Sequence, residues 1–340
     1  MPEIVSTTAG LYPLPDPAKD VLSDLKGNQK EDLIGGDESE AIRAEYDEVR
    51  REFIERLEQA GLDRTVEGQA RWDDMLAHPL AVHDSVETRG IVRYYNNNNF
   101  YREPVVTGAL TPNGDVAAEL DAAAEVADGP LQAVLPGPYS LADLATDEQY
   151  GDDAAFLEAI ADFLAGEIDE FPAVETLFLL EPSLVENRPE DDECERVPEA
   201  LDTVAAAADC DVVVSPYWGA LDEKVYAHVM DADIDALGFD LVSEPDANVY
   251  NAQEYGTPDD VALGVVDGQN TLVESPETIR ERVEWFDGQT PQNDYGRVYA
   301  TANTGLFYLP VNRFEEKLDA LGAATREVRA PPKPYAAETD

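Results

Sequence analysis

The chain has 340 residues, of which 44% are hydrophobic, and its 73 acidic and 23 basic side chains give a formal net charge of −50. This length and apolar content suffice to bury the core of one large domain. The composition excludes direct nucleic-acid binding, because no basic stripe is present to meet phosphates, and no run of about 18 apolar residues is present to cross a membrane.

Strand-like and helix-like apolar periods alternate along the whole chain. Strands are predicted at Ile4–Thr8, Leu62–Val66, Leu131–Leu135, Thr176–Leu180, Asp211–Val214, Ala236–Val242, Ala262–Val266 and Val298–Ala302. Helices are predicted at Ser39–Ala60, Val116–Ala127, Asp153–Phe171, Pro198–Ala208, Leu221–Met230, Pro276–Trp285 and Arg313–Leu321. Residues Ile91–Val106, which contain the run Asn96–Asn99, are predicted to be an inserted hairpin with a polar turn.

This alternation predicts an α/β fold, a single (β/α)8 TIM barrel that spans residues 1–329. Residues 330–340 are expected to be a disordered, Pro-rich tail. An open doubly wound sheet is the alternative, but Thr8-Ala9-Gly10-Leu11 does not match the Gly-rich phosphate turn of that fold.

The acidic residues are scattered through every predicted helix rather than collected in a tail. At ordinary salt this charge would push the compact state apart, whereas at about 1 M salt the Debye length falls to about 3 Å. The pattern indicates adaptation to a salt-rich cytoplasm; an acidic surface that binds basic partners is the alternative. The start MPEIVSTTAG lacks the blocks of a signal peptide, and Cys194 and Cys210 suggest no disulfide framework, so a soluble, cytoplasmic protein is expected.

Polar residues follow the second predicted strand, at the position of a βα loop on the working face of a barrel. The candidates that could bind a polar ligand or an amino group there are Glu67, Gln69, Arg71, Asp73 and Asp74. A hydrogen-bonded structural loop is the alternative.

Other candidates come from the hairpin and from later strand ends. Arg93 and Arg102, with Tyr95, flank the asparagine run, and they could contact an anion or form salt bridges. Tyr139, Tyr217 and Trp218 would point into the barrel mouth, where they could stack on a flat ligand or fill the space. Asp240 and Asp267 end two strands and could act as an acid or base. His78 and His83 are expected to be solvated loop residues rather than metal ligands, and His228 to be structural.

Several blocks, in order, resemble the catalytic barrel of cobalamin-independent methionine synthase, of the methionine synthase and uroporphyrinogen decarboxylase superfamily. These blocks are Thr7–Pro13, Gly61–Met75, Pro104–Gly108, Pro136–Pro138, Leu180–Pro182, Val265–Asp267 and Asn303–Leu306. The resemblance spans about residues 3–325 and implies methyl transfer to homocysteine.

That family uses a zinc ion to activate the homocysteine sulfur, and the ligands of this ion are absent here. The resemblance places Ser215, Tyr217, Gly238 and Thr304 at the four ligand positions, and none of them is a good zinc ligand. Leu180, Leu11 and Leu144 also replace residues that hold homocysteine or stack on folate in the family. The chain thus resembles the zinc-free N-terminal barrel of the two-barrel enzyme, and no metal of its own is expected.

The resemblance implies that the chain acts beside a separate zinc-bearing methionine synthase barrel, with a small-molecule substrate and a methyl donor of the methyltetrahydrofolate type or another kind. Two alternatives remain open. The chain could be a non-catalytic regulatory partner of that barrel, or a metal-independent, decarboxylase-like enzyme.

Overall fold

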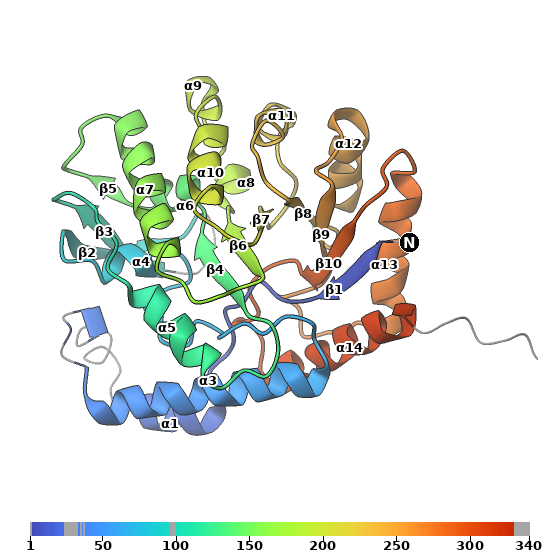
Figure 1. Cartoon of the computed structure of the whole chain (residues 1–340), viewed down its shortest axis with the longest axis horizontal. Coiled ribbons are helices and arrows are strands. Elements are labelled where there is room, and N and C mark those ends of the chain that lie inside the picture. Colours follow the sequence, from blue (N-terminus) through green and yellow to red (C-terminus); the bar gives the residue numbers. More distant parts are fainter. Residues whose placement is uncertain (1, 24–32, 35, 37, 96–99, 330–340) are drawn as a thin grey trace, which may run out of the picture.

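A computed structural model describes residues 2–23, 33–34, 36, 38–95 and 100–329. Its centre is a curled, all-parallel sheet with helices on the outside (Figure 1). The strands, in spatial order, are β1 (Glu3–Ser6), β10 (Arg297–Ala302), β9 (Asp260–Val266), β8 (Ala236–Asp240), β7 (Asp211–Ser215), β6 (Thr176–Leu180) and β4 (Gln132–Pro136). Seven of the eight predicted strands are therefore confirmed.

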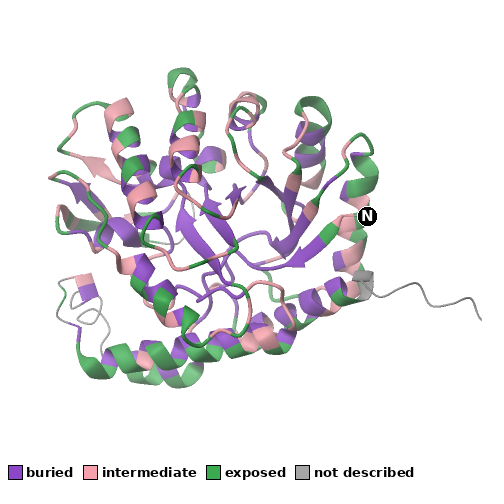
Figure 2. Cartoon of the chain, viewed as in Figure 1, coloured by how far each residue is buried: buried purple, intermediate pink, exposed green. Residues whose placement is uncertain are grey.

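The strands of the sheet are apolar on both faces, because helices cover the outside and the strands' own side chains fill the inside. In β6 every residue of the sequence TLFLL is buried, and β7 continues the pattern with DVVVS. Their register pairs Leu177 with Val212 and Leu179 with Val214. Figure 2 shows this buried centre inside a shell of partly exposed helices.

The predicted strand at Leu62–Val66 is wrong as a full strand: Thr65 forms only an isolated parallel bridge to Leu131. The Asp63 carboxylate accepts hydrogen bonds from the backbone N–H of Ser6 at 2.7 Å and from its hydroxyl at 2.6 Å. The Ser6 carbonyl in turn accepts from the N–H groups of Asp63 and Arg64. A few main-chain bonds and the Asp63 side chain thus take the place of a regular strand ladder in this segment, which lies between the two edge strands β1 and β4.

The seven predicted helices are present in the predicted order, and the described residues contain six further helices. In chain order the helices are α1 (Asp16–Ser23), α3 (Glu40–Ala60), α4 (His78–Ala81), α5 (Asp115–Ala124), α6 (Pro138–Asp143), α7 (Asp153–Ile168), α8 (Ser183–Glu186), α9 (Asp191–Cys194), α10 (Val197–Ala205), α11 (Glu223–Val229), α12 (Pro245–Tyr255), α13 (Pro276–Gln289) and α14 (Val311–Arg329). Helix α3 begins after Ser39, whose hydroxyl accepts from the Ile42 N–H, and ends at Gly61, whose φ of 75° forms the left-handed cap. Helix α12 was not predicted from the sequence, because its apolar face is too weak to give a clear helical periodicity of hydrophobic residues.

The inserted hairpin is confirmed as an antiparallel pair, β2 (Val86–Arg93) and β3 (Phe100–Val106), and β5 (Thr146–Asp147) adds a short third strand. The hairpin begins at Val86, five residues before the predicted Ile91. The predicted turn Asn96–Asn99 and the predicted tail 330–340 lie outside the described residues. In the described ranges, no helix combines the length and the apolarity needed to cross a bilayer.

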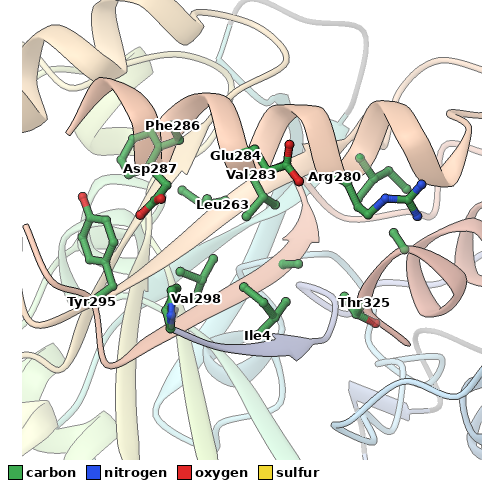
Figure 3. Close-up of a pocket in the computed structure, with 14 residues that line it drawn as sticks. Ile4, Leu263, Arg280, Val283, Glu284, Phe286, Asp287, Tyr295, Val298 and Thr325 are labelled. Carbon is green, nitrogen blue, oxygen red and sulfur yellow. The ribbon is translucent and has the colours of Figure 1, made fainter. Parts of the chain in front are cut away.

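A small apolar crevice of about 100 Å³ lies between α13, α14 and the outer face of the sheet (Figure 3). Ile4, Leu263 and Val298 come from the strands, and Val283 comes from α13. None of the polar strand-end loops lines it. We therefore assign this crevice to helix–sheet packing.

Candidate functional site

Strained backbone gathers on the side of the sheet where the strands end. Four described residues other than glycine have a positive φ: Leu11 (58°), Gln69 (50°), Tyr95 (39°) and Trp218 (75°). Three of them lie in loops that follow β1, the Thr65 bridge and β7, and Tyr95 follows β2 of the hairpin. Such strain concentrates at functional sites, because the surrounding structure must maintain it. We call this side of the sheet the mouth.

The mouth contains a pocket of about 240 Å³, which we call the mouth pocket. Its polar side chains are Gln69, Asp73 and Asp74, and all three belong to the predicted site. Its aromatic side chains are Tyr12, Trp72, Tyr94, Phe100 and Phe307. The sequence analysis missed these aromatic residues, although Trp72 and Tyr94 directly adjoin predicted ones.

Gln69 joins the first two loops of the mouth. Its Oε1 accepts a hydrogen bond of 2.8 Å from the Leu11 N–H, and its own N–H donates to Glu67 Oε1 at 2.8 Å. A Cβ at Gly10 would lie 2.1 Å from Gln69 Oε1. The close approach of these loops therefore requires glycine at position 10.

Glu67 and Arg71 belong to a buried ionic cluster rather than to the lining of the mouth pocket. Arg71 contacts Asp115 at 2.8 Å and Glu38 at 3.2 Å. Burial, together with repulsion from Glu119, raises the pKa of the Glu67 carboxyl well above its usual range. The predicted role of Glu67 and Arg71 in ligand binding remains a prediction; the contacts present here hold the loop in place.

Glu119 also pairs with Arg50 of α3, and both side chains are buried. His78 connects the ionic cluster to the mouth pocket: its Nε2 lies 2.9 Å from Asp115 Oδ2, and its Nδ1 accepts from the Asp73 N–H. The His78 ring is fully buried and stacks on Trp72. His78 and His83 are both buried and hydrogen-bonded, so the expectation of solvated loop histidines is wrong.

The two aspartates of the mouth pocket differ in their partners. Asp73 Oδ2 lies 3.4 Å from Nε of Arg102, so one predicted arginine does reach the predicted loop. Asp74 Oδ1 accepts from the N–H groups of Leu76 and Ala77 at 2.8 and 2.6 Å and from the Tyr94 hydroxyl. Asp74 Oδ2 is buried and has no hydrogen-bond partner among the described residues. Burial raises the pKa of the Asp74 carboxyl to about 6.

An aromatic cluster of Tyr94, Tyr95, Tyr101, Tyr217 and Trp218 connects the hairpin to the loop after β7. The ring centroids of Tyr95 and Trp218 are 5.3 Å apart, and those of Tyr217 and Trp218 are 4.8 Å apart. The Tyr217 hydroxyl and Trp218 Nε1 are buried, with no hydrogen-bond partner in the described part of the chain. Desolvation raises the pKa of Tyr217 well above its usual value, and the Asp74 carboxylate adds to this rise.

The remaining predicted residues lie outside the mouth pocket. Asp240 Oδ1 accepts from the N–H groups of Val242 and Ser243 and from Asn303, and Asp267 Oδ1 accepts from two N–H groups of its own loop. These contacts stabilise turns, so an acid–base role for either residue remains a prediction. Tyr139 donates its hydroxyl proton to the Asn187 carbonyl. Arg93 is exposed on the hairpin, where it pairs in register with Phe100.

The four positions that the resemblance assigns to zinc ligands do not fit a zinc ion. The Tyr217 hydroxyl is buried and its pKa is strongly raised, so it resists the deprotonation that metal binding needs. Gly238 is packed so closely that a Cβ would lie 3.1 Å from the Ser215 Cα. The described residues contain no group of three or more His, Cys, Asp or Glu that could hold a metal ion.

Comparison with known proteins gives concordant matches. A family model described as "Cobalamin-independent synthase, N-terminal domain" matches residues 80–290. A 5-methyltetrahydropteroyltriglutamate–homocysteine methyltransferase of Salinibacter ruber is 29% identical over 196 residues, which cover 54% of this chain and 25% of that protein. The chain thus matches about a quarter of the length of this relative.

Two solved structures share the fold. A B12-independent methionine synthase from Shewanella sp. W3-18-1, in complex with selenomethionine, superposes with a TM-score of 0.78 at 18% identity, covering 97% of this chain and 98% of that one. A candidate vitamin-B12-independent methionine synthase from Listeria monocytogenes gives 0.71 at 16% identity, covering 96% and 99%.

Proposed function

Because the chain belongs to the family of cobalamin-independent synthase N-terminal domains, we propose that it takes part in methyl transfer to homocysteine beside a separate zinc-bearing barrel. The name of the Salinibacter ruber relative supports this reaction. One observation supports assigning zinc binding to the partner barrel. The positions that the resemblance assigns to zinc ligands hold Ser215, Tyr217, Gly238 and Thr304. In this proposal the sulfur is activated on the partner barrel, and the mouth of this chain faces the methyl donor.

We further propose that the segment Leu62–Val66 is the irregular eighth member of a closed (β/α)8 barrel. Its bonds to Ser6 on one side and its bridge to Leu131 on the other support this closure. The closed ring would place the mouth pocket and the aromatic cluster on the same face of the barrel, and this face would meet the partner. A salt-rich cytoplasm is the proposed location, and the net charge of −50 supports it.

The methyl donor is proposed to be a methyltetrahydrofolate-type compound or another small methyl carrier. The aromatic residues of the mouth pocket are in position to stack on a flat, uncharged part of the donor, and Asp74 lines the same pocket. Trp218 and Tyr217 would exclude water from the centre of the mouth.

The test is reconstitution. The chain and a zinc-bearing barrel are purified in molar potassium chloride, separately and together, and methionine formation from homocysteine and methyltetrahydrofolate is measured. Activity that needs both chains, and that falls when Asp74→Asn is introduced, supports the proposal. Turnover of a carboxylic acid by this chain alone, without metal, would replace it with the decarboxylase-like reading.

The second candidate is a non-catalytic partner that stabilises the zinc-bearing barrel. The packing of the buried Tyr217 against the half-buried Trp218 favours it, because these rings fill the centre of the mouth without needing a ligand. Reconstituted activity that is unchanged by Asp74→Asn and by Phe100→Ala would select this candidate.

A further inference from the structure

The mouth pocket has an unusual balance of charge. Its lining includes the carboxylates Asp73 and Asp74 but no lysine, arginine or histidine. Arg102 lies near the carboxylate of Asp73, at 3.4 Å. Asp74 makes no ion pair within the described residues, and its Oδ2 atom is buried without a hydrogen-bond partner although the residue as a whole keeps some exposure. A buried carboxylate oxygen without a partner is costly to keep, so a positive charge placed beside Asp74 would be stabilising.

The walls around this carboxylate are aromatic. Trp72, Tyr94 and Phe100 line the pocket, and the Tyr94 hydroxyl already donates to the other oxygen of Asp74. Aromatic faces attract cations through the negative potential above the ring, and the attraction is largest where water is excluded. They do not replace the oxygen ligands that a small inorganic cation prefers.

We propose that the mouth pocket binds a small organic cation, an ammonium or sulfonium compound, with its charge beside Asp74 and its apolar groups against Trp72 and Phe100. The volume of about 240 Å³ lies below the range of about 300–1,000 Å³ that drug-sized ligands occupy, which fits a small molecule. An anionic ligand would instead face two carboxylates. The inference concerns binding by this chain alone, so it stands or falls independently of the role in methyl transfer.

The experiment uses a matched pair of probes on the full chain in molar potassium chloride. Choline is the cationic probe, and dimethylbutanol, in which a carbon atom replaces the charged nitrogen, is its neutral isostere. Isothermal titration calorimetry measures both. Choline is expected to bind at least about tenfold more tightly than the isostere, because a desolvated cation beside a carboxylate and aromatic faces contributes more than contact area alone.

Variants locate the site. Asp74→Asn keeps an acceptor for the Leu76 and Ala77 N–H groups and removes the charge, so it should weaken choline binding by about tenfold or more while leaving the isostere unaffected. Phe100→Ala is the second variant: Phe100 is 60% exposed, so its truncation spares the core, and it should weaken choline binding by about threefold. Asp121→Asn removes the same charge from an exposed site on α5 and is the control.

Three results would overturn the proposal: equal affinity for choline and its isostere, no binding of either probe, or an equal loss in Asp74→Asn and Asp121→Asn. The last result would mean that the overall negative charge, rather than the mouth pocket, attracts the cation.

Discussion

Gln69 Oε1 accepts a hydrogen bond of 2.8 Å from the Leu11 N–H, and both residues hold a left-handed backbone with φ of 50° and 58°. The backbone of both residues is strained, so the hydrogen bond between them must offset the free-energy cost of their left-handed conformations. The two loops also form one wall of the mouth pocket. Their contact therefore connects the stability of the mouth to its shape.

Replacing Gln69 by leucine should destabilise the protein by about 1–3 kcal/mol, because the buried Leu11 N–H loses its acceptor. Gln69→Glu is the control, because a carboxylate oxygen can accept the same bond. The measurement is the free energy of unfolding in denaturant at fixed high salt. Equal stability of the leucine variant and the wild type would show that this bond is not needed.

The buried pair of Arg50 and Glu119 should be far more sensitive than an exposed pair on the same helix. Arg50→Met leaves the buried Glu119 with only the more distant Arg71, at 3.7 Å, which should cost up to about 3–5 kcal/mol. Arg51→Met, which breaks an exposed pair with Glu48, is the matched control and should cost far less. Thermal unfolding of both variants tests the difference, and similar melting temperatures would contradict it.

Stability should fall as the pH rises from about 4.5 to 7, in part because of Glu181. Burial raises the pKa of this carboxyl to about 7, although hydrogen bonds from Ser140 and Tyr139 oppose the rise. The folded state keeps the proton over this range while the unfolded state releases it, so the contribution is present below pH 4.5 and lost through pH 7.

The readout for Glu181 is the slope of unfolding free energy against pH in the wild type and in Glu181→Gln. The variant should differ in absolute stability, since both oxygens of Glu181 accept hydrogen bonds and glutamine offers only one acceptor oxygen. Its slope should still be shallower, and an unchanged slope would assign the pH dependence to other groups.

Placing a glutamate at position 238, which the resemblance assigns to a zinc ligand, should destabilise the sheet rather than create a metal site. A Cβ there would lie 3.1 Å from the Ser215 Cα and 3.3 Å from the Val214 carbonyl oxygen, and neither backbone atom can move easily. Gly288→Ala, at a helical glycine with open space around its Cβ position, is the control and should be neutral or slightly stabilising. Zinc analysis and thermal unfolding of Gly238→Glu would together decide the point.

The chain should require salt for folding. With a net charge of −50, melting temperature should rise with potassium chloride up to about 1 M, where screening is nearly complete. Sucrose at matched viscosity is the control for solvent effects without screening. A melting temperature that is independent of salt would contradict the reading of the acidic surface.

The sheet was predictable because a parallel strand that is buried on both faces leaves a clear apolar run, as in Thr176–Leu180. The segment Leu62–Val66 is apolar only at its two ends, and it forms no full strand, since Asp63 reaches back to Ser6 through its side chain. Local patterns report burial; they do not report a partner that lies 57 residues away in the chain.

The site was predictable in position more than in detail. Asp73 and Asp74 adjoin the mouth pocket as their place after a predicted strand indicated, whereas the neighbouring Arg71 turns to Asp115 and Glu38. The sequence places all three in one loop but does not tell which way each side chain points. Phe100 and Phe307 come from distant segments, and only the folded chain brings them to the same pocket.

The hydrogen bonds between Ser6 and Asp63 lie where the two edge strands, β1 and β4, meet. This junction has the least regular strand pairing around the sheet. Elsewhere adjacent strands share regular runs of main-chain bonds. Here the segment Leu62–Val66 is joined to Ser6 by the Asp63 carboxylate and two bonds to the Ser6 carbonyl, and to Leu131 by an isolated bridge. Transient opening of the molecule should start at this junction. The amide hydrogen of Thr65 should therefore exchange for deuterium at a higher rate than the amide hydrogens of β6 or β7. A protease that cleaves only the transiently opened state should cut the chain first near this junction.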